Sequence, residues 1–138
     1  FLVKVNVVKT TPSTMFAGLD SGMNHLIRPM FYDSYHRIEN ISRPEGKPRI
    51  YTVVGYICET DTFGANRKIS EIQEDDILCF YNAGAYCFSM ASNYNSRFRP
   101  AEVMVHEGKA CLIRKRETMD DLLKNQVDAE IFEPAMTS

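Results

Sequence analysis

The chain has 138 residues, of which 44% are hydrophobic and 25% are charged, and its formal net charge is −2 at pH 7. These values are typical of one globular domain and exclude a largely disordered chain. The small net charge gives no support for a nucleic-acid or anionic-membrane partner, and no apolar run approaches the ~20 residues that cross a bilayer.

The first third of the chain predicts two strands and a short helix. Residues 2–9 alternate polar side chains with valine, as a half-buried strand does, and residues 15–19 predict a second strand after a Thr-Pro-Ser turn. Apolar side chains recur at three- and four-residue spacings over residues 24–35, which predicts a short helix. We expect Ser21 or Asn24 to cap its N-terminus.

The middle of the chain predicts further strands. Residues 36–42 return to strand-like alternation, and residues 51–58 form an apolar, β-branched run that predicts a buried strand. That run ends on a thiol beside a carboxylate, and reactive groups at the end of a rigid strand are a common way to build a site. Residues 66–70 predict a short extended piece, and residues 76–82 predict another strand.

The last third of the chain predicts a hairpin and a second helix. Residues 102–106 and 110–115 flank a Glu-Gly-Lys turn, as the two strands of a hairpin do. Residues 118–121 have the spacing of a capping box, which predicts a short helix over residues 119–125. Residues 128–138 are expected to form a flexible tail.

Together these elements indicate a mainly β fold, because short strands alternate with turns every eight to twelve residues or so. We predict an antiparallel, Greek-key-like β-barrel or sandwich with a few short helices, formed by residues 1–127 as one domain. The chain opens inside a strand-like segment and without a methionine. We therefore interpret it as a piece of a longer protein.

The four cysteines and three histidines do not have the spacing of a metal site. No Cys-x-x-Cys pair occurs, and no histidine stands at ligand spacing from a cysteine, so we predict no bound metal. We expect reduced thiols in a cytoplasmic protein. His25 and His36 are expected to be partly exposed polar residues.

Polar side chains that are able to carry chemistry follow three apolar elements, at residues 28–32, at Cys58 with Glu59, and at residues 82–86. An arginine binds a carboxylate or phosphate in a fixed two-pronged geometry, and a tyrosine four residues later on a helix points the same way. Each place also has a purely structural interpretation. In this interpretation, residues 28–32 form an amphipathic helix whose arginine extends its charged end into solvent. Cys58 is a buried thiol beside a solvated turn residue, and the ring of Tyr86 packs on glycine-containing backbone. Spacing alone leaves both interpretations open.

Several stretches stand in an order that covers nearly the whole chain. They are residues 19–29 (LDSGMNHLIRP), Tyr32 with Tyr35 and His36, and residues 53–59 (VVGYICE), 82–86 (NAGAY), 90–95 (MASNYN), 99–103 (RPAEV) and 114–118 (RKRET). With these stretches in this order, the sequence resembles the C-terminal domain of the diaminopimelate decarboxylase family. That family belongs to the alanine-racemase and ornithine-decarboxylase class of pyridoxal-phosphate enzymes.

The resemblance implies a two-domain subunit. An N-terminal (β/α)8 barrel, absent from this chain, would hold pyridoxal 5′-phosphate on a lysine, and a β-domain like the alanine racemase C-terminal domain would follow it. The active site would form at the interface of a homodimer. Arg28 and Tyr32 correspond to residues that bind the distal carboxylate of a small amino-acid substrate. Glu59 corresponds to the group that receives its distal amino group, and Tyr86 to a residue that contacts both substrate and cofactor.

In the same resemblance, Cys58 corresponds to the proton donor of the reaction. An ordinary thiol, with a pKa of about 8.5, is mostly protonated near pH 7. It can therefore deliver a proton to the α-carbon after carbon dioxide leaves, while the pyridine ring serves as the electron sink. The implied reaction is the decarboxylation of meso-2,6-diaminopimelate to L-lysine, a step of lysine biosynthesis.

The chain departs from the family pattern at one turn. The usual order is Cys-Glu-Ser-x-Asp, whereas here Thr62 stands at the aspartate position and Asp61 lies one place earlier, so Asp61 is a candidate substitute. The lysine and the phosphate site of the barrel lie outside this sequence. We therefore expect the 138-residue chain alone to bind no pyridoxal phosphate and to be inactive.

Two alternatives to this function are considered. The first is a related decarboxylase with the same fold and cofactor, acting on carboxynorspermidine, ornithine or arginine. The second, from a different functional class, is a non-catalytic β-domain that serves dimerisation.

Overall fold

The computed structural model of the protein describes residues 1–129. Strands make up most of the regular structure, and each helix is only one or two turns long, which confirms a mainly β fold. The elements in chain order are β1 (Leu2–Thr10), β2 (Met15–Leu19), α1 (Arg28–Tyr32), β3 (Ile38–Asn40), β4 (Pro48–Val54), β5 (Thr62–Ser70), β6 (Ile77–Phe80), the 3-10 helices η1 (Phe88–Met90) and η2 (Tyr94–Ser96), β7 (Glu102–His106), β8 (Lys109–Arg114) and α2 (Met119–Leu123).

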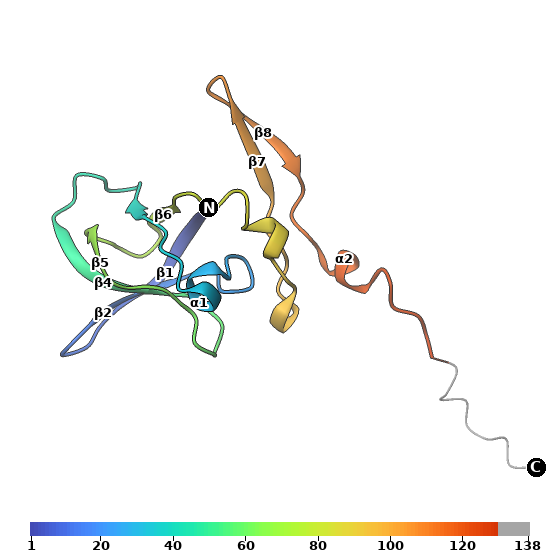
Figure 1. The fold of residues 1–138 in the computed structure, drawn as a ribbon, viewed down its shortest axis with the longest axis horizontal. Coiled ribbons are helices and arrows are strands. Elements are labelled where there is room, and N and C mark those ends of the chain that lie inside the picture. Colours follow the sequence, from blue (N-terminus) through green and yellow to red (C-terminus); the bar gives the residue numbers. More distant parts are fainter. Residues whose placement is uncertain (130–138) are drawn as a thin grey trace, which may run out of the picture.

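Six of the strands form one curved sheet in the order β3-β6-β1-β2-β4-β5. Its two end strands, β3 and β5, also contact each other, so the sheet curls into a nearly closed barrel (Figure 1). Neighbouring strands pair antiparallel, except that β2 and β4 run parallel, with Ala17 beside Val53. The predicted barrel is thus confirmed, with one parallel pair inside an otherwise antiparallel sheet.

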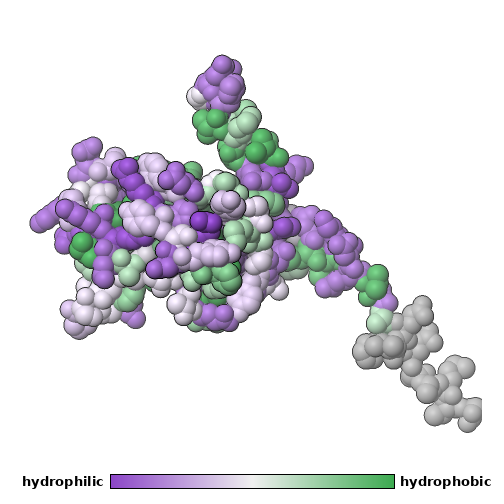
Figure 2. Space-filling view, viewed as in Figure 1, coloured by the Kyte–Doolittle hydropathy of each residue, from purple (hydrophilic) through white to green (hydrophobic). Residues whose placement is uncertain are grey.

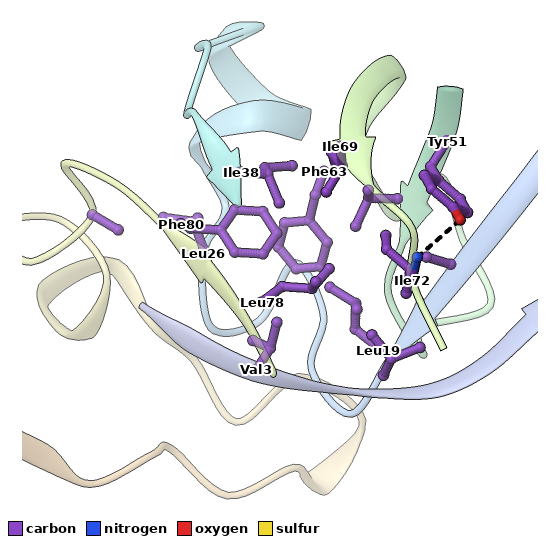
Figure 3. Packing of buried hydrophobic residues seen from close by; sticks show 14 of the residues in the cluster. Val3, Leu19, Leu26, Ile38, Tyr51, Phe63, Ile69, Ile72, Leu78 and Phe80 are labelled. Carbon is purple, nitrogen blue, oxygen red and sulfur yellow. Dashed lines mark hydrogen bonds between the residues drawn. The ribbon is translucent and has the colours of Figure 1, made fainter. Parts of the chain in front are cut away.

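The barrel encloses a single apolar core. Phe63 and Phe80, both 1% exposed, meet edge to face with their ring centroids 5.0 Å apart. The hydroxyl of Tyr51 accepts a hydrogen bond from the backbone N–H of Ile72 at 2.9 Å, so the one polar group of this buried ring is satisfied (Figure 3). The remaining members of the core come from every strand of the barrel and from the segments that cap it: Val3, Val5, Ala17, Leu19, Leu26, Ile38, Val53, Ile69, Leu78, Ala83 and Cys87.

The boundaries of the central strands differ from those that the sequence predicts. β4 ends at Val54 rather than at Cys58, and β5 begins at Thr62 rather than at residue 66. The Cys-Glu pair therefore lies on the loop of residues 55–61, outside the strand. The apolar character of this loop gave it the appearance of a strand.

The predicted helix is present but is not capped as predicted. α1 begins at Arg28, and its N-cap is Ile27, which makes no side-chain hydrogen bond to the helix. The expected capping roles of Ser21 and Asn24 are therefore wrong. Both side chains are instead 2% exposed and lie in the interior.

The expected exposure of the two histidines is also wrong. His25 and His36 are each 5% exposed. His36 Nδ1 is 2.9 Å from the carbonyl oxygen of Tyr81, which is 45 positions away in the sequence. Burial of a polar ring costs less when one of its nitrogens has a hydrogen-bond partner.

The β7–β8 hairpin stands away from the barrel (Figure 1). Its turn places Glu107 and Gly108 at positive φ, as a two-residue hairpin turn requires, which confirms the predicted hairpin. Val103 and Leu112 form a cross-strand pair and are 55% and 61% exposed. Apolar side chains below the polar tip of the hairpin therefore face solvent in this chain (Figure 2).

The C-terminal part of the described chain contains the second predicted helix. The carboxylate of Asp121 accepts hydrogen bonds from the backbone N–H and the hydroxyl of Thr118, so the capping box is present. Of the predicted tail at residues 128–138, residues 130–138 lie outside the described part. Neither helix within residues 1–129 is long and apolar enough to cross a membrane.

Candidate active site

The loop that carries Cys58 and Glu59 is held by the buried carboxylate of Asp61. Asp61 is 5% exposed and accepts hydrogen bonds from the backbone N–H groups of Ile57 (2.9 Å) and Met23 (2.7 Å). Burial raises the pKa of Asp61, and the two backbone donors act in the opposite direction. The carboxylate therefore ties the loop to itself and to the segment that precedes α1.

Two glycines make room for this carboxylate. A Cβ on Gly55 would collide with the carboxylate of Asp61, and a Cβ on Gly22 would lie 2.6 Å from its Oδ2. The backbone N–H of Gly55 also donates to the carbonyl oxygen of Asp61 at 2.7 Å. Thr62, by contrast, is the first residue of β5. Asp61, and not Thr62, thus orients the turn.

The tip of the loop presents two reactive side chains to solvent. Cys58 and Glu59 are both exposed. The hydroxyl of Tyr94, from η2, donates a hydrogen bond to Oε1 of Glu59. This hydrogen bond raises the pKa of Tyr94.

A different cysteine has the environment of a structural thiol. Cys87 is 8% exposed, and its thiol donates to the backbone carbonyl of His25 at 3.2 Å. Burial raises the pKa of Cys87 to about 11. The interpretation of Cys58 as a buried thiol is therefore wrong, and it applies to Cys87 instead.

Arg28 of α1 lies between two tyrosine rings. Its guanidinium carbon is 5.8 Å from the ring centroid of Tyr32 and 4.8 Å from that of Tyr86, distances at which a cation is attracted to an aromatic face. Both tyrosines are more than half exposed. The structure thus brings together three side chains that are separated by up to 58 positions, and their outer edges remain open to a ligand.

A cavity of about 230 Å³ lies between α1 and the loop that carries Cys58 and Glu59. It is lined on one side by Met30 and Phe31 of α1 and on the other by Glu59 and Thr60. The loop and the helix therefore face each other across one hollow of the surface. Of the five residues that the sequence suggests for a site, Glu59 lines that hollow. Arg28 and Tyr32 lie on α1, Cys58 precedes Glu59 on the loop, and Tyr86 contacts Arg28.

A buried histidine fixes the segment that leads into α1. His25 Nε2 is 2.7 Å from the carbonyl oxygen of Phe98, and Nδ1 is 2.8 Å from the hydroxyl of Ser21. Because a carbonyl oxygen only accepts, Nε2 carries the proton and Nδ1 accepts from Ser21. Burial lowers the pKa of His25, and the Phe98 carbonyl acts in the opposite direction. The neutral imidazole thus joins residues 21–25 to the segment that follows η2.

That segment is also anchored from its other side. The carboxylate of Glu117 accepts hydrogen bonds from the backbone N–H of Arg99 (2.8 Å), from Nε of Arg99 (2.7 Å) and from the side-chain amide of Asn93 (2.6 Å). The hydrogen bond from the Arg99 side chain is the largest cause that lowers the pKa of Glu117 to about 2. Glu117 is therefore ionised at neutral pH and holds both ends of the turn around Tyr94.

Comparison with known proteins places this geometry in a family. The family model described as "Pyridoxal-dependent decarboxylase, C-terminal sheet domain" matches residues 1–84. The chain belongs to this family. A diaminopimelate decarboxylase of Methanothermobacter thermautotrophicus is 50% identical over 91% of this chain and 29% of its own length. The crystal structure of diaminopimelate decarboxylase from M. jannaschii is 37% identical, with a TM-score of 0.86 over 94% of this chain and 30% of that one.

A second solved structure is described with a bound ligand. The crystal structure of the M. jannaschii enzyme "in co-complex with L-lysine" is 39% identical, with a TM-score of 0.83 over 92% of this chain and 30% of that chain. The chain thus spans about 30% of the length of the decarboxylases it matches. This agrees with the interpretation of the sequence as part of a longer protein of the family.

The sequence did not predict the residues whose hydrogen bonds hold the candidate site residues and their segments in place. His25, Tyr94 and Glu117 each lie inside a stretch that resembles the family, but their partners are far away in the sequence. The available signal was the presence of polar or aromatic side chains in those stretches without an assigned contact. Spacing does not show which distant group each one meets.

We predict that replacing Asp61 destabilises the chain. In Asp61→Ala, the backbone N–H groups of Ile57 and Met23 lose their acceptor, and two unsatisfied buried donors cost about 2–4 kcal/mol. The free energy of unfolding in urea measures the loss. Asp120→Ala, which removes an exposed carboxylate, is the matched control. Equal unfolding midpoints for the two variants would contradict the anchoring role of Asp61.

We also predict a pH-dependent stabilisation from Glu117. Its pKa is about 2 in the folded chain against an ordinary value of 4.5, so its contribution is complete above about pH 4.5 and is lost as the pH falls toward 2. The melting temperature of Glu117→Gln should lie well below that of the unmodified chain at pH 7, and the gap should close at low pH. Thermal unfolding followed by circular dichroism between pH 7 and 2 measures this.

The control for the pH dependence is Glu107→Gln, whose side chain is 83% exposed. Its melting temperature should follow that of the unmodified chain at every pH. A gap for Glu117→Gln that stays constant down to pH 2 would show that the ion pair is not its cause.

Proposed function

We propose that residues 1–127 are the C-terminal β-domain of a pyridoxal-phosphate-dependent decarboxylase that converts meso-2,6-diaminopimelate to L-lysine and carbon dioxide in lysine biosynthesis. The observations that carry the proposal are the contact of Arg28 with the exposed rings of Tyr32 and Tyr86, and the exposed Cys58 and Glu59 on the loop that faces α1. A relative with 50% identity, named diaminopimelate decarboxylase, supports the choice of substrate.

The residues present fit one side of a pyridoxal-phosphate site. Tyr86 is 53% exposed and held from behind by Arg28, so its phenol is available to a cofactor bound by another part of the protein. We expect the lysine that bonds to the cofactor in the N-terminal barrel that the family resemblance implies. When bound, the cofactor supplies an electron-accepting ring that stabilises the charge left on the α-carbon.

The far end of the substrate would be bound by opposite charges. Arg28 is suited to a carboxylate, with the hydroxyl of Tyr32 as a second donor. Glu59 is suited to an ammonium group, and it faces α1 across the shared cavity. A substrate with both a carboxylate and an ammonium at its distal end satisfies both. Ornithine and arginine lack the distal carboxylate.

Cys58 would supply the proton that completes the reaction. Its thiol is exposed on a loop whose position is set by Asp61, so it can reach a substrate held outside this domain. The carboxylate leaves as carbon dioxide, and the thiol proton replaces it on the α-carbon, which gives the amine product. Solvent then returns a proton to the sulfur.

The remainder of the active site would come from outside this chain. The domain spans about 30% of the length of its relatives, and the β7–β8 hairpin exposes apolar side chains that a further domain would cover. We infer that these partners are the protein's own N-terminal (β/α)8 barrel and a second subunit of a homodimer, in the cytoplasm. A β-domain used only for dimerisation would have no need of an exposed thiol beside a carboxylate.

Activity of the full-length protein that contains this chain tests the proposal. We expect carbon dioxide release from meso-diaminopimelate, with carboxynorspermidine, ornithine and arginine turned over at least a hundredfold more slowly, about 3 kcal/mol of discrimination. Preference for one of the other three amino acids would support a related decarboxylase instead. Absence of decarboxylation with all four would contradict the enzymatic proposal.

Removal of the thiol tests the role of Cys58. In the full-length protein, Cys58→Ala should lower kcat by about 10²- to 10⁴-fold, the usual contribution of a positioned acid, while the absorbance of the bound cofactor is retained. Cys111→Ala, which removes the other exposed thiol, should retain the original kcat. Loss of cofactor absorbance in Cys58→Ala would contradict the assignment as proton donor.

A further inference from the structure

Glu59 is held by a tyrosine hydroxyl. Its Oε1 accepts a hydrogen bond from the hydroxyl of Tyr94, which comes from a segment 35 positions later. Within residues 1–129, no arginine or lysine forms an ion pair with Glu59. The hydroxyl is neutral, so it orients the carboxylate without cancelling its charge, and Oε2 is left for another donor.

The turn that carries Tyr94 is built with strained backbone. Asn95 and Ser96 both have left-handed conformations, with φ values of 56° and 54°. Such conformations cost energy and persist only where the surroundings enforce them. Here the side-chain amide of Asn93 enforces them, because it donates to the carbonyl of Arg97 (3.0 Å) and to Glu117 (2.6 Å).

The same turn is also joined to the segment that leads into α1. The carbonyl oxygen of Phe98 accepts a hydrogen bond from the imidazole Nε2–H of His25, and residues 21–25 lead directly into α1. The Asp61 carboxylate fixes the loop of Glu59 to the same residues through Met23. The segments of Tyr94 and Glu59 are therefore both anchored to residues 21–25, and the hydrogen bond between the two side chains joins these segments.

We propose that Tyr94 is a positioning residue for Glu59, one that holds Oε1 so that Oε2 is presented to the distal ammonium of the substrate. The inference rests on the proposed function, because it takes Glu59 as the group that receives the ammonium. A lysine or arginine at this place would hold the carboxylate equally well but would neutralise it. A tyrosine supplies direction and leaves the full negative charge for the ligand.

Kinetics of the full-length protein test this role. Tyr94→Phe removes only the hydroxyl, so we expect the KM for meso-diaminopimelate to rise about tenfold while kcat stays within about twofold, the pattern of lost ground-state binding. Glu59→Gln should raise KM further. The double variant should match Glu59→Gln alone, because Tyr94 acts through Glu59. An unchanged KM in Tyr94→Phe, a fall in kcat without a rise in KM, or additive effects in the double variant would each overturn the inference.

Tyr81→Phe is the matched control. The hydroxyl of Tyr81 also donates to a glutamate, Glu39, at 2.6 Å, and both side chains lie away from the cavity beside α1. This variant loses the same kind of hydrogen bond and should keep the original KM. An equal rise in KM for Tyr81→Phe would show a general loss of packing and would count against the inference.

A second measurement separates this inference from the proposed function. The contact with Glu59 raises the pKa of Tyr94, so in Glu59→Gln the ring-carbon NMR signal of Tyr94 should titrate at lower pH than in the unmodified protein. A full-length protein that does not use diaminopimelate, with this titration intact, fails the proposed function. A protein that uses it with the KM unchanged in Tyr94→Phe fails this inference alone.

Discussion

The candidate site depends on the burial of one carboxylate between two loops. The parallel pairing of β2 with β4 makes both strands leave the barrel at the same end, with Gly18 beside Val54. The segments that follow them, residues 20–27 and 55–61, therefore meet. Asp61 stands where they meet, and its hydrogen bonds to Ile57 and Met23 convert this proximity into a fixed arrangement.

Backbone contacts extend the arrangement to the rest of the site. The backbone N–H of Tyr56 donates to the carbonyl of Ser21 (3.0 Å), and the N–H of Ser92 donates to the carbonyl of Asn24 (2.8 Å). The segments that carry Cys58, Tyr86 and Tyr94 thus all bind the short stretch before α1. Arg28 follows that stretch directly. Main-chain hydrogen bonds therefore set the position of its backbone relative to the other groups.

Local sequence patterns predicted most elements of this fold. They failed where contacts between residues far apart in the sequence determine the structure. The alternation in β1, the apolar spacing of α1, the turn of the β7–β8 hairpin and the capping box of α2 each depend on residues close in sequence. The burial of His25 depends instead on the carbonyl of Phe98, 73 positions away. The end of β4 was misplaced because the apolar run continues to Ile57, whereas the chain turns at Gly55, which packs against the carboxylate of Asp61.

The candidate site residues themselves came from the family resemblance, since spacing left a structural interpretation open for each. For the cysteine, the exposure of Cys58 contradicts the structural interpretation as a buried thiol. A thiol that serves packing is buried and satisfied, as Cys87 is, whereas Cys58 is open to solvent on an anchored loop. The supporting residues had no such signal, because a tyrosine or histidine in a matched stretch does not reveal its partner.

The carboxylates of the domain differ in how their charge is balanced. Asp76 is 4% exposed, and burial alone would raise its pKa, but donors from Gln73, Asn40 and Arg43 lower it. Glu117 is balanced by Arg99 in the same way. A carboxylate with a cation already in place gains little from a cationic ligand, because the new charge must replace the old one. Glu59 is oriented by a neutral hydroxyl and keeps its charge. The fold thus pairs Asp76 and Glu117 with arginines, whereas Glu59, which faces the hollow beside α1, is oriented by a tyrosine hydroxyl.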